Sequence, residues 1–231
     1  MTERAPRAGE APARGWFITF EGIDGCGKTT QMRRLARRLR EEGYQVEETI
    51  EPGGTRIGKQ IRRILLDTAN QEISPATELL LYFASRAQNV SQRIRPALAA
   101  GKIVLSDRYT DSTMVYQGFA RGLGEEVVAA LERIACRGLK PDLTIYLDID
   151  LETGLARARV RNDSREGREA AETRMDEQSR EFYQRVREGY RRLAGREPGR
   201  FRVIDGRRDA DAVAADVWAA VEEWLGGRQR V

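Results

Sequence analysis

The chain has 231 residues, with 40 Lys and Arg against 36 Asp and Glu, a formal net charge of +4 and no His. This length fits one domain of ordinary size or two small ones. The missing imidazole excludes a Ser-His-Asp triad, a Cys-His pair and a His-ligated zinc site. Any catalysis must therefore use carboxylates, Lys, Arg, hydroxyls, thiols or a bound metal.

The N-terminal segment and the cysteines bear on where the protein works. Residues 1–15 mix Arg, Glu, Pro and Ala without an apolar stretch, so we expect a disordered tail and no secretion signal. No apolar run approaches the ~20 residues of a membrane helix. Two cysteines, Cys26 and Cys136, cannot build a disulfide framework, which favours the cytoplasm. The charges are mixed along the chain, so we expect neither nucleic-acid nor membrane partners.

Short β-type runs alternate with longer helical patterns. Strands are predicted at 16–20, 44–50, 102–106, 143–147 and 201–204. Helices are predicted at 29–42, 57–65, 75–99, 111–117, 125–136, 151–161, 170–194 and 210–225. Pro96 is expected to bend or end the third of these helices. The alternation predicts one doubly wound α/β domain over 16–231, with a parallel sheet covered on both faces.

The loop after the first predicted strand carries the clearest motif. Residues 22–29, GIDGCGKT, fit G-x-x-x-x-G-K-[ST] and open the first predicted helix. Such a loop points backbone N–H groups at phosphates, Lys28 reaches the β- and γ-phosphates, and the Thr29 hydroxyl can hold Mg²⁺. Cys26 reads as a small tolerated side chain rather than a nucleophile. The predicted ATP-binding residues here are Gly22, Ile23, Asp24, Gly25, Cys26, Gly27, Lys28, Thr29 and Thr30.

Asp107 ends the third predicted strand, at the edge where open parallel sheets bind their ligands. It is the natural second metal ligand beside Thr29, like the aspartate of a Walker-B motif. From this residue alone, a helix cap is an equal alternative. Arg108 beside it favours a phosphate-binding pair.

A phosphate loop indicates a nucleotide but not a reaction. The chain has no N-K-x-D guanine motif and is short for a motor or a large ATPase, which leaves a small phosphotransferase. Such an enzyme needs a mobile basic cover that excludes water from the transferring group. The Arg-rich segment at about 157–174 fits this lid, and the alternative is a solvated helical face.

Several motifs, in order, resemble those of thymidylate (dTMP) kinases over about residues 16–225. They are residues 20–31 (FEGIDGCGKTTQ), 51–55 (EPGGT), 85–88 (SRAQ), 107–109 (DRY), 116–118 (YQG) and 141–143 (PDL), with the Arg-rich segment ending at Arg174. The resemblance implies a P-loop kinase core with a five-stranded parallel sheet, helices on both faces and an Arg-rich lid. It also implies transfer of the γ-phosphoryl group of ATP to dTMP with Mg²⁺, for dTTP synthesis, and a homodimer.

The resemblance also implies roles in an acceptor site. Arg108 would grip the dTMP phosphate, Arg86 would hydrogen-bond the thymine edge, and Tyr116 would crowd the 2′ position of the sugar. Tyr82 would stack on the base, with core packing as the alternative for one of Tyr82 and Phe83. The other implied acceptor-site residues are Asp24, Glu51, Ser112, Thr113 and Gln117.

The donor side and the lid complete the implied site. Asp205 and Arg207 would lie beside the adenine of ATP. The phosphate loop has no Arg at its variable positions, which resembles the bacterial type whose lid supplies the catalytic arginines. Arg157, Arg161 and Arg174 are the candidates, beside Lys28, Asp24 and Arg108 as catalytic residues.

One departure concerns the acceptor phosphate. The family commonly has Arg directly before Glu-Pro-Gly-Gly-Thr, and here that residue is Ile50. Our hypotheses are that Arg108 suffices or that Arg56 substitutes, and weaker acceptor affinity is the remaining alternative. Competing functions are a kinase for dUMP, CMP or AMP, a nucleotide-binding switch without turnover, and a nucleic-acid-binding module.

Overall fold

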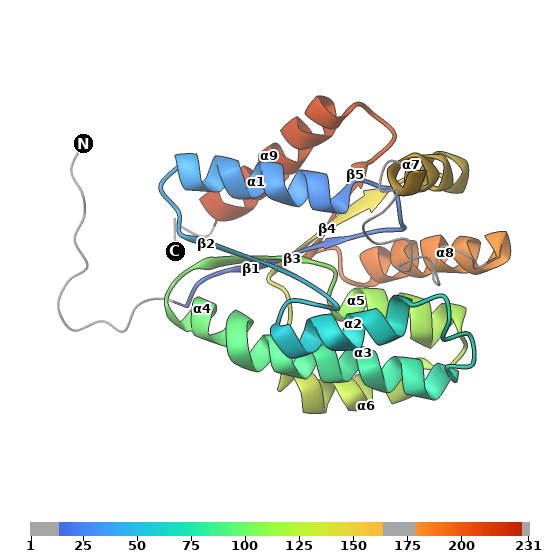
Figure 1. Cartoon of the computed structure of the whole chain (residues 1–231). Coiled ribbons are helices and arrows are strands. Elements are labelled where there is room, and N and C mark those ends of the chain that lie inside the picture. Colours follow the sequence, from blue (N-terminus) through green and yellow to red (C-terminus); the bar gives the residue numbers. More distant parts are fainter. Residues whose placement is uncertain (1–13, 164–178, 228–231) are drawn as a thin grey trace.

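In the computed structural model, five strands form one parallel sheet in the order β2-β3-β1-β4-β5 (Figure 1). Residues 14–163 and 179–227 are described, the stretch 158–163 by its backbone alone. The strands are β1 Phe17–Glu21, β2 Val46–Ile50, β3 Ile103–Asp107, β4 Leu143–Asp148 and β5 Phe201–Asp205. All five predicted strands are confirmed, with ends that differ by two residues at most.

The three central strands β1, β3 and β4 are apolar along most of their length because both faces of the sheet are covered. Neighbouring side chains alternate between two cores. Phe17 joins a cluster with residues of α3, α4 and α6, whereas Ile18 joins a cluster with residues of α1 and α9. Burial on both sides fixes the strand register, since a slip of one residue would exchange the two faces.

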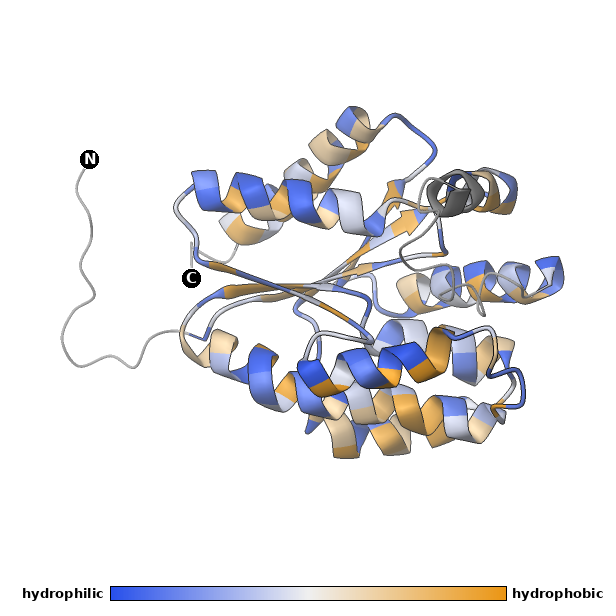
Figure 2. Ribbon diagram, in the orientation of Figure 1, coloured by the Kyte–Doolittle hydropathy of each residue, from blue (hydrophilic) through white to orange (hydrophobic). Residues whose placement is uncertain are grey.

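Two layers of helices enclose the sheet (Figure 1). The helices α1 Lys28–Glu41 and α9 Ala210–Gly226 pack together on one face. On the other face lie α2 Arg56–Leu66, α3 Pro75–Asn89, α4 Arg95–Ala99, α5 Thr110–Thr113 and α6 Glu125–Cys136. In Figure 2, hydrophobic colours run along the central strands and the helices of this second layer.

Two predicted helices contain π-helical segments. The predicted 75–99 helix is built as α3, a π segment at Val90–Ile94 (η1), and α4. Pro96 stands in the first turn of α4, where its missing N–H interrupts the regular α-helical bonding, so the chain changes helix type there instead of ending. The predicted 111–117 helix is α5 followed by a second π segment, Met114–Ala120 (η2).

The helices α7 Leu151–Asp163 and α8 Arg180–Arg196 flank the region where a lid is predicted. The predicted 170–194 helix does not run unbroken into α8. Ser179 has extended backbone, with φ −67° and ψ 161°, and its hydroxyl accepts from the N–H of Phe182, so it caps a helix that begins at Arg180. Most of the predicted lid, including Arg174, lies outside the described residues, as do residues 1–13 of the predicted tail.

In the described part of the chain, no helix has the length and hydropathy needed to span a bilayer.

Candidate active site

The predicted phosphate loop connects β1 to α1 at the carboxyl edge of the sheet. Gly22, Gly25 and Gly27 have φ values of 138°, 78° and 95°, which favour glycine. A Cβ on Gly22 would lie 2.7 Å from the carbonyl oxygen of Leu147, so that position also needs glycine for space. No side chain caps α1 at Gly27, and the N–H groups of its first turn can therefore face a phosphate.

Lys28 is buried at the start of α1 and its ammonium group lies inside the loop. Its Nζ donates to the carbonyl oxygens of Gly22, at 3.0 Å, and Ile23, at 2.9 Å. Nζ also lies 3.6 Å from the sulfur of Cys26. Burial raises the pKa of the Cys26 thiol, despite the nearby Lys28 charge. The thiol stays protonated, which agrees with a packing role for Cys26 rather than nucleophilic chemistry.

Thr29 and Asp107 come together as the sequence predicts. The Thr29 hydroxyl donates to the Asp107 carboxylate, because β3 pairs with β1 and brings Asp107 opposite Phe20, beside the loop. Asp107 does not cap α5, whose N-cap is Tyr109 without a side-chain hydrogen bond. The described residues contain no group of three or more acidic, Cys or His side chains that could hold a metal. Two hard oxygen ligands fit Mg²⁺, which takes its other ligands from phosphates and water.

Arg108 reaches from the end of β3 onto the phosphate loop. Its Nη2 lies 2.8 Å from Oδ1 of Asp24, and its Nη1 donates to the carbonyl oxygen of Gly22 at 3.2 Å and to Oγ of Ser112 at 3.1 Å. The guanidinium also lies over the ring of Tyr116, 4.9 Å from its centroid. Arg108 has φ 71°, a left-handed conformation that is strained for a non-glycine residue and recurs at functional sites.

Arg86 lies on α3 and is fully buried, and all three nitrogens of its guanidinium have polar contacts. Its Nε is 3.0 Å from Oε2 of Glu51, its Nη1 donates to Thr113 Oγ1 at 2.9 Å, and its Nη2 donates to the carbonyl oxygen of Tyr109 at 3.1 Å. Burial raises the pKa of Glu51, an effect that Arg86 and Asn89 oppose. Glu51 therefore orients Arg86 and is itself closed off from solvent.

The two aromatic residues of α3 that are candidates for stacking on the base, Tyr82 and Phe83, differ in burial. Phe83 is buried in the core and lies against the guanidinium of Arg86, 5.1 Å from its ring centroid. Tyr82 is half-buried at the edge of the other cluster. Gln117 is buried, with its amide donating to Glu78 at 2.9 Å, and Tyr116 is buried with its hydroxyl 3.3 Å from Nη2 of Arg108.

On the far side of the loop, Arg157 of α7 contacts the segment after β5. It donates to the carbonyl oxygens of Gly206, at 2.8 Å, and Arg207, at 3.1 Å. Arg207 and Asp205 pair with each other at 2.7 Å. Arg161 lies in α7 with its side chain outside the described residues, and Thr30 is exposed on α1.

Two buried residues beside Arg108 were not singled out from the sequence. Glu21 at the end of β1 accepts hydrogen bonds from Ser112, at 2.5 Å, and from Tyr190 of α8, at 2.9 Å. A charged residue ending an otherwise apolar strand was a signal that could have found Glu21. Tyr190 is 169 positions further along the chain, and no local pattern connects the two.

Comparison with known proteins bears on this arrangement. A sequence model of the family described as thymidylate kinase matches residues 20–217. A thymidylate kinase of Geobacter sulfurreducens is 54% identical over 203 residues, covering 88% of this chain and 94% of that protein. The chain belongs to the thymidylate kinase family. A second family member, from Caldanaerobacter subterraneus, is 50% identical over 214 residues, covering 93% of this chain and 98% of that protein.

A crystal structure of thymidylate kinase from Ehrlichia chaffeensis has the same fold. It superposes with a TM-score of 0.72 at 32% identity, covering 90% of this chain and 99% of that one. Membership of the thymidylate kinase family makes the chain a phosphotransferase that uses ATP and Mg²⁺ to convert dTMP to dTDP. The fold and reaction implied by the sequence motifs are thereby confirmed.

Proposed function

We propose that the thymidylate kinase reaction takes place between the phosphate loop at 22–29 and Arg108, with ATP in the loop and dTMP against the arginine. The observation that carries this assignment is the contact between the two, 2.8 Å from Arg108 to Asp24 and 3.2 Å from Arg108 to Gly22. A guanidinium suited to an acceptor phosphate thus lies beside the loop suited to the donor phosphates. Direct transfer requires this proximity.

The transfer needs no general base. An oxygen of the dTMP phosphate, already anionic near neutral pH, attacks the γ-phosphorus of ATP. The new O–P bond forms as the bond from the γ-phosphorus to the bridging oxygen breaks, and that oxygen leaves with ADP. Lys28 would stabilise charge on the donor phosphates and Arg108 would hold the acceptor phosphate, so positioning and electrostatics supply the rate.

Thr29 and Asp107 are the proposed ligands of Mg²⁺. Their oxygens are already in hydrogen-bond contact beside the loop. The ion would neutralise charge on the ATP phosphates. Asp24, which pairs with Arg108, would face the sugar and phosphate of dTMP.

We propose that the side chains of Arg86 and Tyr82 recognise the thymine base. The hydrogen bonds to Thr113 and Tyr109 and the ion pair with Glu51 hold the Arg86 guanidinium before dTMP binds, which lowers the ordering cost of binding. Glu51 then acts through Arg86 and is a positioning residue. Tyr116, buried beside Arg108, is proposed to crowd the 2′ position of the sugar.

The candidate lid arginines divide into two groups. Arg157 is occupied by the carbonyl groups of Gly206 and Arg207, which supports a role on the adenine side with Asp205. We assign the contact with the transferring phosphoryl group to Arg161 or Arg174. Separate alanine substitutions distinguish them, because the one that touches the transition state lowers kcat much more than it raises either KM.

The decisive experiment measures ADP formation with Mg·ATP and each of dTMP, dUMP, dCMP, CMP, AMP and GMP. Turnover should be fastest with dTMP and should collapse in Lys28→Ala. A preference for another monophosphate would refute the roles of Tyr82, Arg86 and Tyr116 while leaving the donor site intact. ATP binding without any turnover would favour a nucleotide-binding switch.

We also propose that the protein is a homodimer through the outer face of α2, α3 and α6. These helices lie side by side (Figure 1) and carry most of the large exposed apolar side chains. Those side chains are Ile57 and Ile64 on α2, Leu80 on α3, and Val127 and Ile134 on α6. Ile134 is 75% exposed, and apolar side chains gathered on one layer are typical of a subunit interface.

Sedimentation velocity tests the dimer. The wild-type chain should sediment at twice the monomer mass, and Ile134→Asp should shift it toward monomer. Val203→Asp on the β5 edge, at an exposed apolar residue outside this face, is the matched control and should leave the mass unchanged. We place the protein in the cytoplasm, because ATP and dTMP are intracellular and both cysteines are free thiols.

A further inference from the structure

The carboxyl group of Glu21 lies next to Arg108 and is connected to it through the hydroxyl groups of Ser112 and Tyr190. Its residue is fully buried at the end of β1. One oxygen, Oε1, accepts the backbone N–H of Tyr109 at 2.8 Å. This bond holds the peptide group that follows Arg108, and so restrains the residue whose φ of 71° is strained.

The other oxygen of Glu21 belongs to a triangle with two hydroxyl groups. Oε2 lies 2.5 Å from Oγ of Ser112 and 2.9 Å from the phenol oxygen of Tyr190, and these two hydroxyls are 2.8 Å apart. Nη1 of Arg108 completes the cluster, at 3.1 Å from the Ser112 oxygen and 3.5 Å from the Tyr190 oxygen. Ser112 comes from α5 and Tyr190 from α8.

The charge of Glu21 decides whether Arg108 is needed as a hydrogen-bond donor in this triangle, because it sets the number of protons that the three oxygens share. When Glu21 is ionised, both hydroxyls donate to it, so the third side of the triangle has two oxygens and no proton. Nη1 of Arg108 supplies the missing donor. When Glu21 is protonated, it donates to one of the two hydroxyls, and that hydroxyl turns its own proton toward the other. All three sides then hold a proton without Arg108, and the guanidinium loses both that role and the attraction of the negative charge.

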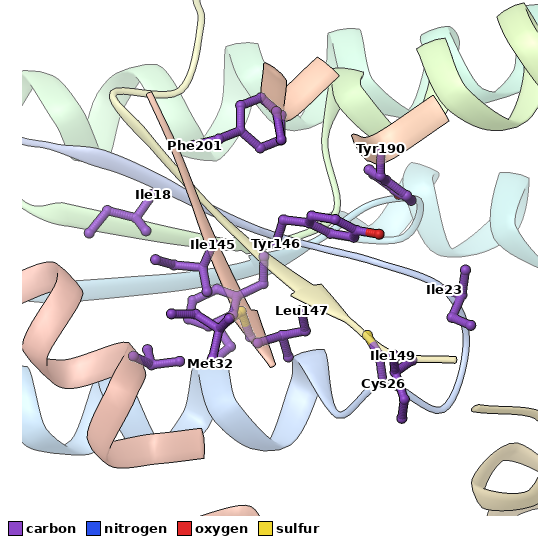
Figure 3. Packing of buried hydrophobic residues seen from close by; sticks show 14 of the residues in the cluster. Ile18, Ile23, Cys26, Met32, Ile145, Tyr146, Leu147, Ile149, Tyr190 and Phe201 are labelled. Atoms are coloured by element: carbon purple, nitrogen blue, oxygen red, sulfur yellow. The ribbon is translucent and has the colours of Figure 1, made fainter. Parts of the chain in front are cut away.

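We propose that Glu21 is a positioning residue that holds the Arg108 guanidinium for the acceptor phosphate, and that Tyr190 connects this carboxylate to α8. The inference rests on the proposed role of Arg108. In Figure 3, Tyr190 lies beside Tyr146 of β4, and their rings stack with centroids 5.1 Å apart. Tyr190 is therefore fixed from one side by the sheet and from the other by Glu21.

Through Tyr190, Glu21 contacts the helix α8, which follows the predicted lid in the chain. The helix begins at Arg180, just after residues 164–178, and Tyr190 lies on it about three turns from the start. A movement of α8 would shift the phenol group away from Glu21 and alter the restraint on Arg108. The acceptor site is thus mechanically linked to the helix that follows the predicted lid.

The test is steady-state kinetics of the full chain with dTMP and ATP varied separately, for Glu21→Gln, Ser112→Ala and Tyr190→Phe. At pH 8 we expect the KM of dTMP to rise about tenfold in Glu21→Gln and severalfold in Tyr190→Phe, while the KM of ATP changes less than twofold. Tyr146→Phe is the matched control, since it removes a buried phenol hydroxyl that contacts Asp148 and not Glu21. An equal effect in Tyr146→Phe and Tyr190→Phe would overturn the link to α8.

A pH series adds a readout that packing alone would not move. Burial and the nearby Asp111 charge raise the pKa of Glu21 to about 7, against the opposing effects of Ser112, Arg108 and Tyr190. The ratio of the dTMP KM in Glu21→Gln to that in wild type should be near one at pH 6 and about tenfold at pH 8. Titration of the dTMP phosphate is common to both enzymes and cancels. A ratio near one at pH 8 as well as at pH 6 would overturn the proposal.

Arg108→Ala separates this inference from the proposed function. If Arg108→Ala raises the KM of dTMP and Glu21→Gln does not, only the positioning role fails. If Arg108→Ala leaves the KM of dTMP unchanged, the assignment of Arg108 itself is wrong, and the positioning role falls with it. Should Glu21→Gln not fold, Ser112→Ala and Tyr190→Phe carry the test, because each removes one hydroxyl of the triangle and keeps the buried carboxyl.

Discussion

Nη2 of Arg108 and Oδ1 of Asp24 lie 2.8 Å apart, which ties the residue after β3 to the phosphate loop after β1. Both side chains are partly shielded, with 16% and 23% of their surface exposed, so their attraction is less screened than that of a surface pair. Arg108 also contacts Ser112 and the Gly22 carbonyl, and its guanidinium is thus held at three points before substrate binds.

The first prediction concerns this geometry. Arg108→Lys should raise the KM of dTMP at least tenfold, although the charge is kept, because one ammonium group cannot reach Asp24, Ser112 and Gly22 at once and cannot grip a phosphate with two N–H groups. Asp24→Asn should have a smaller effect on the same constant. Initial-rate measurements with ATP saturating check both. A Lys variant with unchanged KM would refute the bidentate grip.

The second prediction concerns the residue before Glu-Pro-Gly-Gly-Thr. Ile50 pairs with Asp107 across β2 and β3, so its side chain stands at the edge where dTMP is proposed to bind. Arg56 is exposed at the start of α2 and is available as a substitute. We expect Ile50→Arg to lower the KM of dTMP severalfold and Arg56→Ala to raise it. If Arg56→Ala has no effect, the hypothesis that Arg56 substitutes is wrong.

The third prediction concerns the buried Arg86–Glu51 pair. Both side chains are essentially inaccessible to solvent, with 1% and 0% exposed. Glu51→Gln leaves the Arg86 charge buried without its partner and should lower the free energy of unfolding by about 3 kcal/mol. Urea denaturation measures this loss. Glu47→Gln is the control. Glu47 lies on β2 in a partly exposed pair with Arg93 of η1, and its substitution should cost less than about 1 kcal/mol.

The fourth prediction concerns the metal. Asp107→Asn keeps an oxygen beside Thr29 but removes the charge that favours Mg²⁺. We expect the Mg²⁺ concentration for half-maximal activity to rise about tenfold, with partial recovery of kcat at high Mg²⁺. Titration of activity with Mg²⁺ at fixed ATP measures it. An unchanged Mg²⁺ requirement would mean that Asp107 only holds the Thr29 hydroxyl in place.

How far the sequence predicts this site depends on how local each contact is. The Thr29–Asp107 contact was predictable, because a phosphate loop and the end of a neighbouring parallel strand share one edge of the sheet. The parallel sheet was also predictable, because short apolar runs that alternate with helices indicate buried parallel strands. The residues between these motifs were named only through the resemblance to thymidylate kinases.

The contacts that the sequence missed are those set by packing. Glu21 and Tyr190 meet across 169 positions, because α8 folds back over the end of β1, and no spacing in the chain records that return. Tyr82 and Phe83 are neighbours on one helix, yet Tyr82 lies half-buried at the edge of one hydrophobic cluster and Phe83 lies inside the other, which is also a result of tertiary packing. The late start of α8 depends on the Ser179 cap, which helical periodicity alone did not reveal.

The fifth prediction concerns stability and pH. In the folded chain, burial first and the Asp111 charge second raise the pKa of Glu21 to about 7 from a usual 4.5, and Arg86 is a further charge that faces it. Between these values the folded state holds a proton that the unfolded state has released, so the free energy of unfolding falls as pH rises from about 5 to 8. The loss is at most about 3 kcal/mol.

Glu21→Gln removes this titration. Its free energy of unfolding should therefore be close to that of wild type at pH 5 and exceed it at pH 8, because only the wild-type protein then holds a buried charge. Urea denaturation of both proteins at pH 5, 6, 7 and 8 gives the difference directly, and every other titrating group cancels in it. Parallel curves for the two proteins would show that Glu21 keeps an ordinary pKa, and that its carboxylate is ionised at every pH at which the enzyme works.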